Sequence, residues 1–142
     1  MGILVTKLTF SLFKRLAVIR LKEAKILFKK KNYSGAYYLS GYVIEMGLKA
    51  YYCKGVNKNT FPPEKKIVDS LYSHKLEDLL NVCELNWHLD SDIQKNNSLK
   101  NAWVIVRDWN EKSRYKLFDK NESESMINSV EEVFKWIQTK WL

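Results

Sequence analysis

The stretch SGAYYLSGYVIEMGLKAYYCK, residues 34–54, decides the fold because it is apolar on almost every side when it is placed on a helix. A helix without a polar face is packed by neighbours on several sides, so this segment is expected to be the central helix. Ser34 is its predicted N-cap and Gly55 its predicted C-terminal stop. Gly41 and Gly47 each cost about 1 kcal/mol relative to Ala in a helix interior, and their presence indicates close helix approach.

Around this helix, apolar residues recur at steps of three and four, which is the spacing of amphipathic helices. Asn121 with Glu124 has the capping-box spacing and predicts the start of the last helix. Residues 56–72 hold a Pro pair and are expected to form the longest connection, and residues 109–120 are expected to be non-helical. The prediction is one all-α domain over 1–142, an up-and-down bundle of four to five helices. The expected helices span 13–30, 34–54, 73–83, 93 or 98 to 108, and 121–141.

Composition excludes several classes of protein. Only 5 Gly and 2 Pro leave little punctuation for a many-stranded β fold. No apolar run approaches the roughly 20 residues that cross a bilayer, and Lys7 and Lys14 interrupt the apolar N-terminus, so we expect a cytoplasmic protein without a membrane span or secretory signal. Cys53 and Cys83 have no metal-ligand spacing and are interpreted as small buried thiols. With two isolated histidines and no Gly-rich phosphate loop, no metal and no cofactor are expected.

Positive charge gathers in the N-terminal part. Through Lys58 there are 12 Lys and Arg against 2 acidic residues, a net +10, whereas the remainder has 12 against 14, a net −2, which together give +8. Clustered Lys and Arg favour a polyanionic partner, because binding phosphates releases counterions; solubility alone is the other explanation. The first predicted helix shows a basic strip: Lys14, Arg15, Lys22, Lys25, Lys29 and Lys30.

Glu45 is a carboxylate in the middle of the most apolar segment. A buried charge needs a partner or a raised pKa, since leaving it unpaired costs several kcal/mol. Lys49 stands one turn later in the favourable Glu-before-Lys order. Three other groups remain alternatives, namely His74, Arg107 and Arg114.

Residues 103–115, WVIVRDWNEKSRY, combine two tryptophans, two arginines and a tyrosine. Arg forks onto phosphate, and indole and phenol rings stack on bases, so a nucleotide pocket is one interpretation. The other is that the rings belong to the core and that the arginines pair with acidic neighbours.

Three separated motifs resemble the HEPN family, the higher eukaryote and prokaryote nucleotide-binding domain. YSGAYYLSGYVIEMGLKA at 33–50 is similar to its central helix pattern YLxGYxxExxLKA, SHKLEDLL at 73–80 resembles its HxLxxLL helix, and Trp109 with Arg114-Tyr115 resembles its WxxxxRY segment. The resemblance implies a bundle of four or five helices, frequently dimeric, associated with RNA or nucleotides and often with toxin-antitoxin, defence or stress systems.

Many HEPN proteins are metal-independent ribonucleases with an Arg-x(4–6)-His motif. Arg107 matches the arginine of that motif, but Arg114 stands seven residues on and no histidine lies between Lys112 and Arg114.

Two functions follow as hypotheses. The first is a non-catalytic dimeric module that binds nucleotide or RNA, or pairs with a partner such as a nucleotidyltransferase-type protein. Five tryptophans in a small core also favour a dimer. The alternative is an endoribonuclease in which Arg107 and Arg114 stabilise the cyclising phosphate, with Glu45, Glu111, Tyr115 or His74 as the base. The candidate binding residues are Arg107, Trp109, Arg114, Tyr115, His74, Glu45 and Lys49.

Overall fold

The computed structural model describes residues 7–55 and 64–142. Within these ranges it has seven α-helices, one 3-10 helix and no strand, which confirms the all-α prediction but exceeds the predicted four to five helices. The elements are α1 (Phe10–Lys29), α2 (Tyr33–Gly55), α3 (Lys65–Leu71), α4 (Leu76–Val82), α5 (Asn86–Lys95), α6 (Asn97–Val106), η1 (Glu111–Tyr115) and α7 (Lys120–Lys140).

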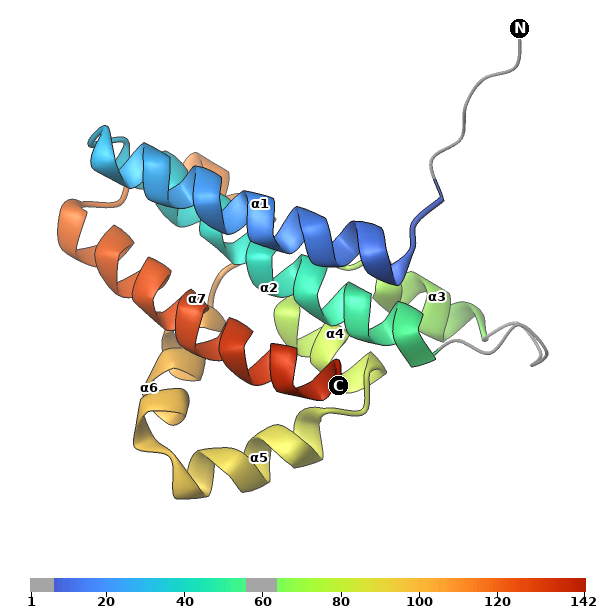
Figure 1. Cartoon of the computed structure of the whole chain (residues 1–142). Helices are drawn as coiled ribbons and strands as arrows, with labels where there is room; N and C mark the ends of the chain where they lie inside the picture. The colour runs from blue at the N-terminus through green and yellow to red at the C-terminus, as the bar shows by residue number, and fades with distance from the viewer. Residues whose placement is uncertain (1–6, 56–63) are drawn as a thin grey trace, which may run out of the picture.

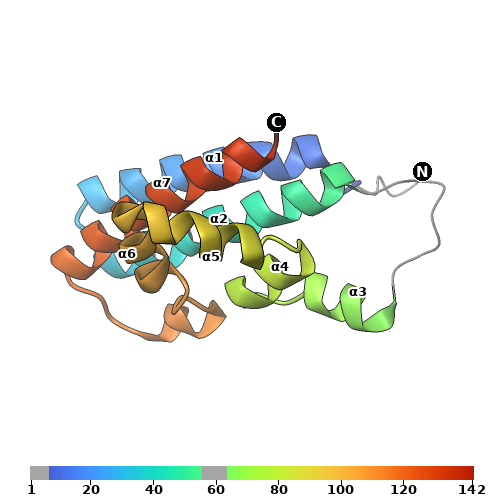
Figure 2. The same cartoon turned by 90° about the horizontal axis from the view of Figure 1, so that it is seen from below.

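Helix α2 is central, as its apolar surface predicts. In Figure 1, α1 runs antiparallel to α2, and α7 lies beside them; both α1 and α7 pack against α2. Figure 2 shows α3 and α4 on the other side of α2 from α1, whereas α5 and α6 lie in front of α2 in this view and α6 packs against α7. The side chains of Val43, Ile44 and Leu48 are fully buried between these layers, so the core follows α2.

Gly41 and Gly47, the two glycines in the interior of α2, have different surroundings. A Cβ on Gly41 would come closer than 3.0 Å to the indole ring of Trp109, which lies after α6 and outside any helix. A Cβ on Gly47 would stand 3.4 Å from Ile137 of α7, an ordinary contact distance. The expected close approach is therefore found at Gly41, where the neighbour is a single ring and not a helix, whereas Gly47 has room for a methyl group beside α7.

Several helix starts differ from the predicted ones. Helix α1 begins three residues earlier than predicted, with Thr9 accepting from the Leu12 N–H. Ser34 lies inside α2, where its hydroxyl accepts at 2.8 Å from the Phe118 N–H instead of capping the helix. The box that caps α7 is formed by Asp119 and Glu122, not by Asn121 and Glu124.

The middle of the chain is more helical than predicted. Helix α3 and the 3-10 helix η1 occupy segments expected to be connections, and α5 was not predicted; the Pro pair at 62–63 lies outside the described residues. Ser73 does not cap α4, because the N-cap of that helix is Lys75. Instead, the Ser73 hydroxyl accepts from the Lys75 N–H and donates to Asp78. Helix α6 starts at Asn97 behind an Asn96 cap and ends at Val106, two residues before the predicted end.

The thiols and the tryptophans are distributed between core and surface. Cys83 is buried, and burial raises the pKa of its thiol to about 12; Cys53 is only half-buried. Trp103, Trp109 and Trp141 belong to the core, so the tryptophan count alone does not require a dimer.

None of the described helices is both long and apolar enough to cross a membrane.

Candidate functional site

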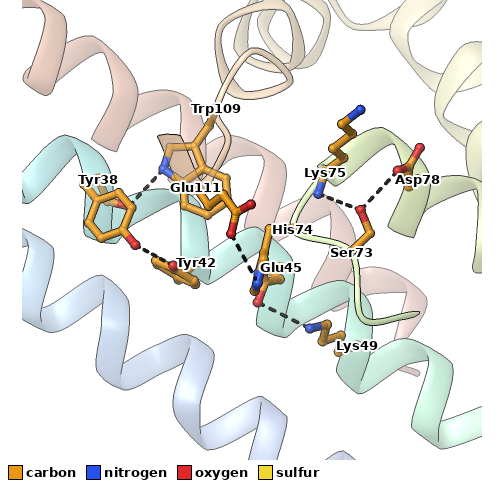
Figure 3. Close-up of polar contacts among 10 residues, drawn as sticks. All are labelled: Tyr38, Tyr42, Glu45, Lys49, Ser73, His74, Lys75, Asp78, Trp109 and Glu111. Atoms are coloured by element: carbon orange, nitrogen blue, oxygen red, sulfur yellow. Dashed lines mark hydrogen bonds and ion pairs between the residues drawn. The ribbon is translucent and has the colours of Figure 1, made fainter. Parts of the chain in front are cut away.

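Glu45 is buried and paired, as predicted. Its side chain on α2 is 2% exposed, and its carboxylate accepts from Lys49 Nζ at 3.4 Å and from His74 Nδ1 at 2.7 Å (Figure 3). The structure therefore selects two of the candidate partners, Lys49 and His74. Each Glu45 oxygen has its own cationic or N–H partner, which offsets the cost of burying the charge.

His74 lies at the meeting point of three elements. It belongs to the short connection between α3 and α4, it contacts Glu45 of α2 through Nδ1, and its Nε2 stands 3.7 Å from Glu111 of η1. The side chain is 40% exposed. A carboxylate on one ring nitrogen fixes the orientation of the ring, and here the other nitrogen faces a second carboxylate, that of Glu111.

A cavity of about 660 Å³ opens beside His74. Its walls are the connection after α3, the start of α4 and residues 107–112, so His74 and Arg107 line the same cavity although they are far apart in sequence. The charged lining is mixed. Three basic residues, Lys75, Arg107 and Lys112, face the cavity together with four acidic ones, Glu77, Asp78, Asp108 and Glu111.

Trp109 belongs to the core, which selects the core interpretation of its ring over stacking on a base. Its ring is 1% exposed, donates through Nε1 to the Tyr38 carbonyl at 2.9 Å and meets the Tyr42 ring edge-on at 4.9 Å. Both contacts join the segment after α6 to α2, and Gly41 provides the space for the ring. Trp109 thus positions the neighbouring cavity wall.

Arg114 and Tyr115 do not line this cavity, which corrects the expectation of one pocket for both arginines. Arg114 is exposed and lies over the Tyr115 ring at 4.8 Å. The neighbouring phenol groups, that of Tyr115 first and then that of Tyr38, raise the pKa of the guanidinium above its ordinary value. The 77% exposed Tyr115 ring therefore already has a cationic neighbour on its face.

Tyr38 and Tyr42, on successive turns of α2, form a hydrogen-bonded pair. The Tyr38 and Tyr42 hydroxyls are 2.6 Å apart, and burial, reinforced by this hydrogen bond, raises the pKa of Tyr42. Tyr42 therefore stays neutral at physiological pH and is a poor candidate for a base.

Among the residues that the structure describes, no group of three His, Cys, Asp or Glu side chains is arranged to hold a metal ion.

The comparison with protein families settles the resemblance. The model of the HEPN domain matches residues 10–140, almost the whole chain. This chain belongs to the HEPN domain family. Comparisons with curated proteins and with solved structures found no significant match. Membership supports a nucleotide- or RNA-related module in general terms.

The sequence did not reveal the cavity or the contact between His74 and Glu111. Both depend on η1, which lies in a segment that has no helical period and was expected to be non-helical. One local signal was present: Asn110 and Ser113 form a capping box around the start of η1, with the hydroxyl of Ser113 close to the Asn110 N–H. The spacing of these two residues predicts a helical turn when it is read as a cap.

Proposed function

We propose that this HEPN domain is a nucleotide- or RNA-binding module whose ligand occupies the cavity between the α3–α4 connection and residues 107–112. One observation carries the proposal: Arg107, which matches the arginine of the family's motif, lines the same cavity as His74. Arg107 is exposed, so its guanidinium is available to a ligand.

The mixed lining favours a nucleotide over a bare polyanion. Arg107, Lys75 and Lys112 supply donors for phosphate oxygens, and the arginine fork suits a bidentate contact. The carboxylates of the same lining repel phosphate, but they accept hydrogen bonds from ribose hydroxyls and from base amino groups. A ligand that carries both kinds of group satisfies both halves of the cavity.

The two arginines form a matched pair for testing this site. Calorimetric titration of the protein with nucleoside mono- and diphosphates at low salt should show binding. Arg107→Ala should weaken the affinity by about tenfold or more, which is the effect of losing one charged hydrogen bond. Arg114→Ala should leave the affinity unchanged, because Arg114 lies outside the cavity. Equal losses from both substitutions, or no binding to any nucleotide at millimolar concentration, would contradict the proposal.

The second candidate function is a metal-independent endoribonuclease, and the position of His74 favours it. The stretch between Arg107 and Arg114 lacks a histidine, but His74 reaches the Arg107 cavity from another element and is oriented by buried Glu45. In this reaction Nε2 of His74 accepts the 2′-hydroxyl proton, the O2′–P bond forms, and the P–O5′ bond breaks, with the 5′ oxygen taking a proton from water. Arg107 stabilises the charge on the phosphate.

Labelled RNA incubated with the protein in EDTA tests this second function. Cleavage that ends in a 2′,3′-cyclic phosphate, and that is lost in both His74→Gln and Arg107→Ala, would support it. Nucleotide binding without such cleavage leaves the binding module as the function.

We further propose that the module is a homodimer, acts with a nucleotidyltransferase-type partner and belongs to a toxin-antitoxin, defence or stress system. The family resemblance is the support for these three statements. A monomer mass in light scattering at tens of micromolar protein would exclude the dimer.

A further inference from the structure

The outward face of α1 carries two parallel rows of side chains with a seven-residue spacing. One row is apolar and the other is basic. Ile19 and Ile26 are 41% and 48% exposed, whereas Ala17 and Ala24 on the opposite side of the helix are fully buried. The apolar row is Leu12, Ile19 and Ile26, and the basic row is Arg15, Lys22 and Lys29.

Nothing in the described part of the chain covers this face. Helix α1 packs against α2 and α7 through its inner side, and in Figure 1 it lies in front of α2 with its outer side turned to the viewer. No residue of α1 lines the proposed nucleotide cavity, so the proposed function does not account for these rows.

The spacing itself indicates what fits the face. Side chains seven residues apart lie almost in line along a helix, and a row of apolar residues at this interval is what a second helix packs against at a shallow angle. RNA needs the basic row but gains little from branched aliphatic side chains, because it binds through phosphates and stacked bases. A helix that lies on a membrane presents a broad apolar face, whereas here a basic row borders a narrow apolar one.

Charge decides between a second copy and a different protein. Helix α1 has Glu23 as its only acidic residue, so two copies of α1 facing each other would bring like charges together. The outer side of α7 is acidic in places, but none of the exposed large apolar residues belongs to α7. We propose that the outer face of α1 docks an amphipathic helix of another protein, which carries acidic residues beside its own apolar row.

A designed peptide tests the docking directly. The probe is a fluorescent helical peptide of three heptads, about 21 residues, with Leu in one row and Glu in the adjacent row. A peptide of the same composition in scrambled order is the control for charge. Binding to the full chain is measured by anisotropy at moderate salt, and the scrambled peptide is expected to bind at least about tenfold more weakly.

Matched variants locate the contact on α1. Ile26→Asp should weaken binding of the heptad peptide by about tenfold or more, and Lys22→Glu should do so without changing an apolar residue. Val104→Asp on α6 introduces the same change at a similarly exposed position, 43% exposed, and should have no effect. Circular dichroism melting checks that each variant is folded, and nucleotide binding in the cavity should be unchanged in all three.

Four outcomes would overturn the proposal. Equal affinity for the two peptides, or an Ile26→Asp variant that binds as well as the wild type, would show simple charge attraction. Tighter, Ile26-dependent binding to vesicles of phosphatidylserine and phosphatidylcholine would assign the face to a membrane surface, and the same result with poly(U) would assign it to RNA.

Discussion

Glu45 and His74 are 29 residues apart in the chain, yet their side chains meet at 2.7 Å between Oε1 and Nδ1. The contact fixes the α3–α4 connection against the central helix, and this connection forms one wall of the cavity. A single buried carboxylate thus joins the core of the fold to the candidate site. The same carboxylate also accepts from Lys49, so removing it affects two partners at once.

Replacing Glu45 with Ala should destabilise the protein by about 2 kcal/mol, from the lost charged hydrogen bonds and the space left behind. A loss of about 3 to 5 kcal/mol applies where the partner charge stays buried and uncompensated. Here His74 is 40% exposed and the Lys49 side chain 15% exposed, so both reach water, which lowers the expected cost. Urea denaturation measures the change.

Glu45→Gln is the matched control for this prediction. Its amide oxygen still accepts from His74 and its volume is retained, so the loss of stability should be clearly smaller than for Ala. If Glu45→Ala melts at the wild-type temperature, the ion pair contributes nothing to the fold and the prediction is wrong.

Gly41→Ala should destabilise the fold by about 1 to 3 kcal/mol, because the added Cβ would overlap the buried Trp109 ring. Gly35→Ala on the same helix is the control. There the new Cβ would stand 3.6 Å from Leu27, an ordinary contact, and the better helix propensity of Ala should stabilise the protein by about 0.5 to 1 kcal/mol. Thermal melting of the two variants should therefore shift in opposite directions, and equal shifts would contradict the structure.

The long elements were predictable because burial imposes a period that is visible in the sequence. Helix α2 is apolar all round, and Glu45 stands out against that background. Helix α5 gave no such signal, since Leu89 is the only buried residue of its ten. The predicted start of α7 is wrong for another reason. The sequence DKNESE at 119–124 holds two overlapping capping boxes, and the structure uses the one that begins at Asp119.

The candidate site was predictable only in part, because it is assembled by tertiary contacts. Spacing in the sequence correctly pairs Glu45 with Lys49 one turn later, but the contact with His74 exists only once α4 packs against α2. Composition groups Arg107 with Arg114, whereas the fold places only Arg107 in the cavity. The sequence also does not distinguish an aromatic ring in a pocket from one in the core, which is why Trp109 was open to both interpretations.

The interaction between Asp92 and Trp136 should make stability depend on pH. The Trp136 N–H donates to Asp92 at 2.7 Å and is the main reason why the pKa of this carboxyl lies below its ordinary value; Lys140 adds to the effect. A lowered pKa in the folded state stabilises the protein above the unfolded pKa of 3.8, and this contribution is lost as the pH falls through the folded pKa.

Asp92→Asn should therefore cost less than about 1 kcal/mol at neutral pH, because the exposed carboxyl is screened by solvent. The difference from the wild type should disappear under strongly acidic conditions. The exposed neighbour Asp90 provides a control, since Asp90→Asn makes the same change in net charge. A deficit of Asp92→Asn that persists unchanged at pH 2 would show that the ionised carboxylate is not the cause.

RNA binding, if it uses the basic strip of α1, should be strongly dependent on salt. All six residues of that strip are exposed, and each phosphate contact that they make should contribute about −0.7 to the slope of log affinity against log salt. Reversing Lys22, Lys29 and Lys30 to Glu should then flatten the slope by about 2. Reversal of three exposed lysines elsewhere makes the same change in net charge and should flatten the slope much less; suitable positions are Lys95, Lys100 and Lys116.

The comparison of the two triple variants separates a located contact from a general effect of charge. Equal flattening would mean that RNA responds only to the net charge of the protein, and the strip would have no specific part in binding. Ile26→Asp adds a further distinction, because it removes an apolar contact at the centre of the same face while it adds only one negative charge. It should change the RNA slope by no more than about 0.7, but it should weaken docking of a heptad-spaced helix by about tenfold or more. An absence of RNA binding at low salt would assign the basic row of α1 to a protein partner alone.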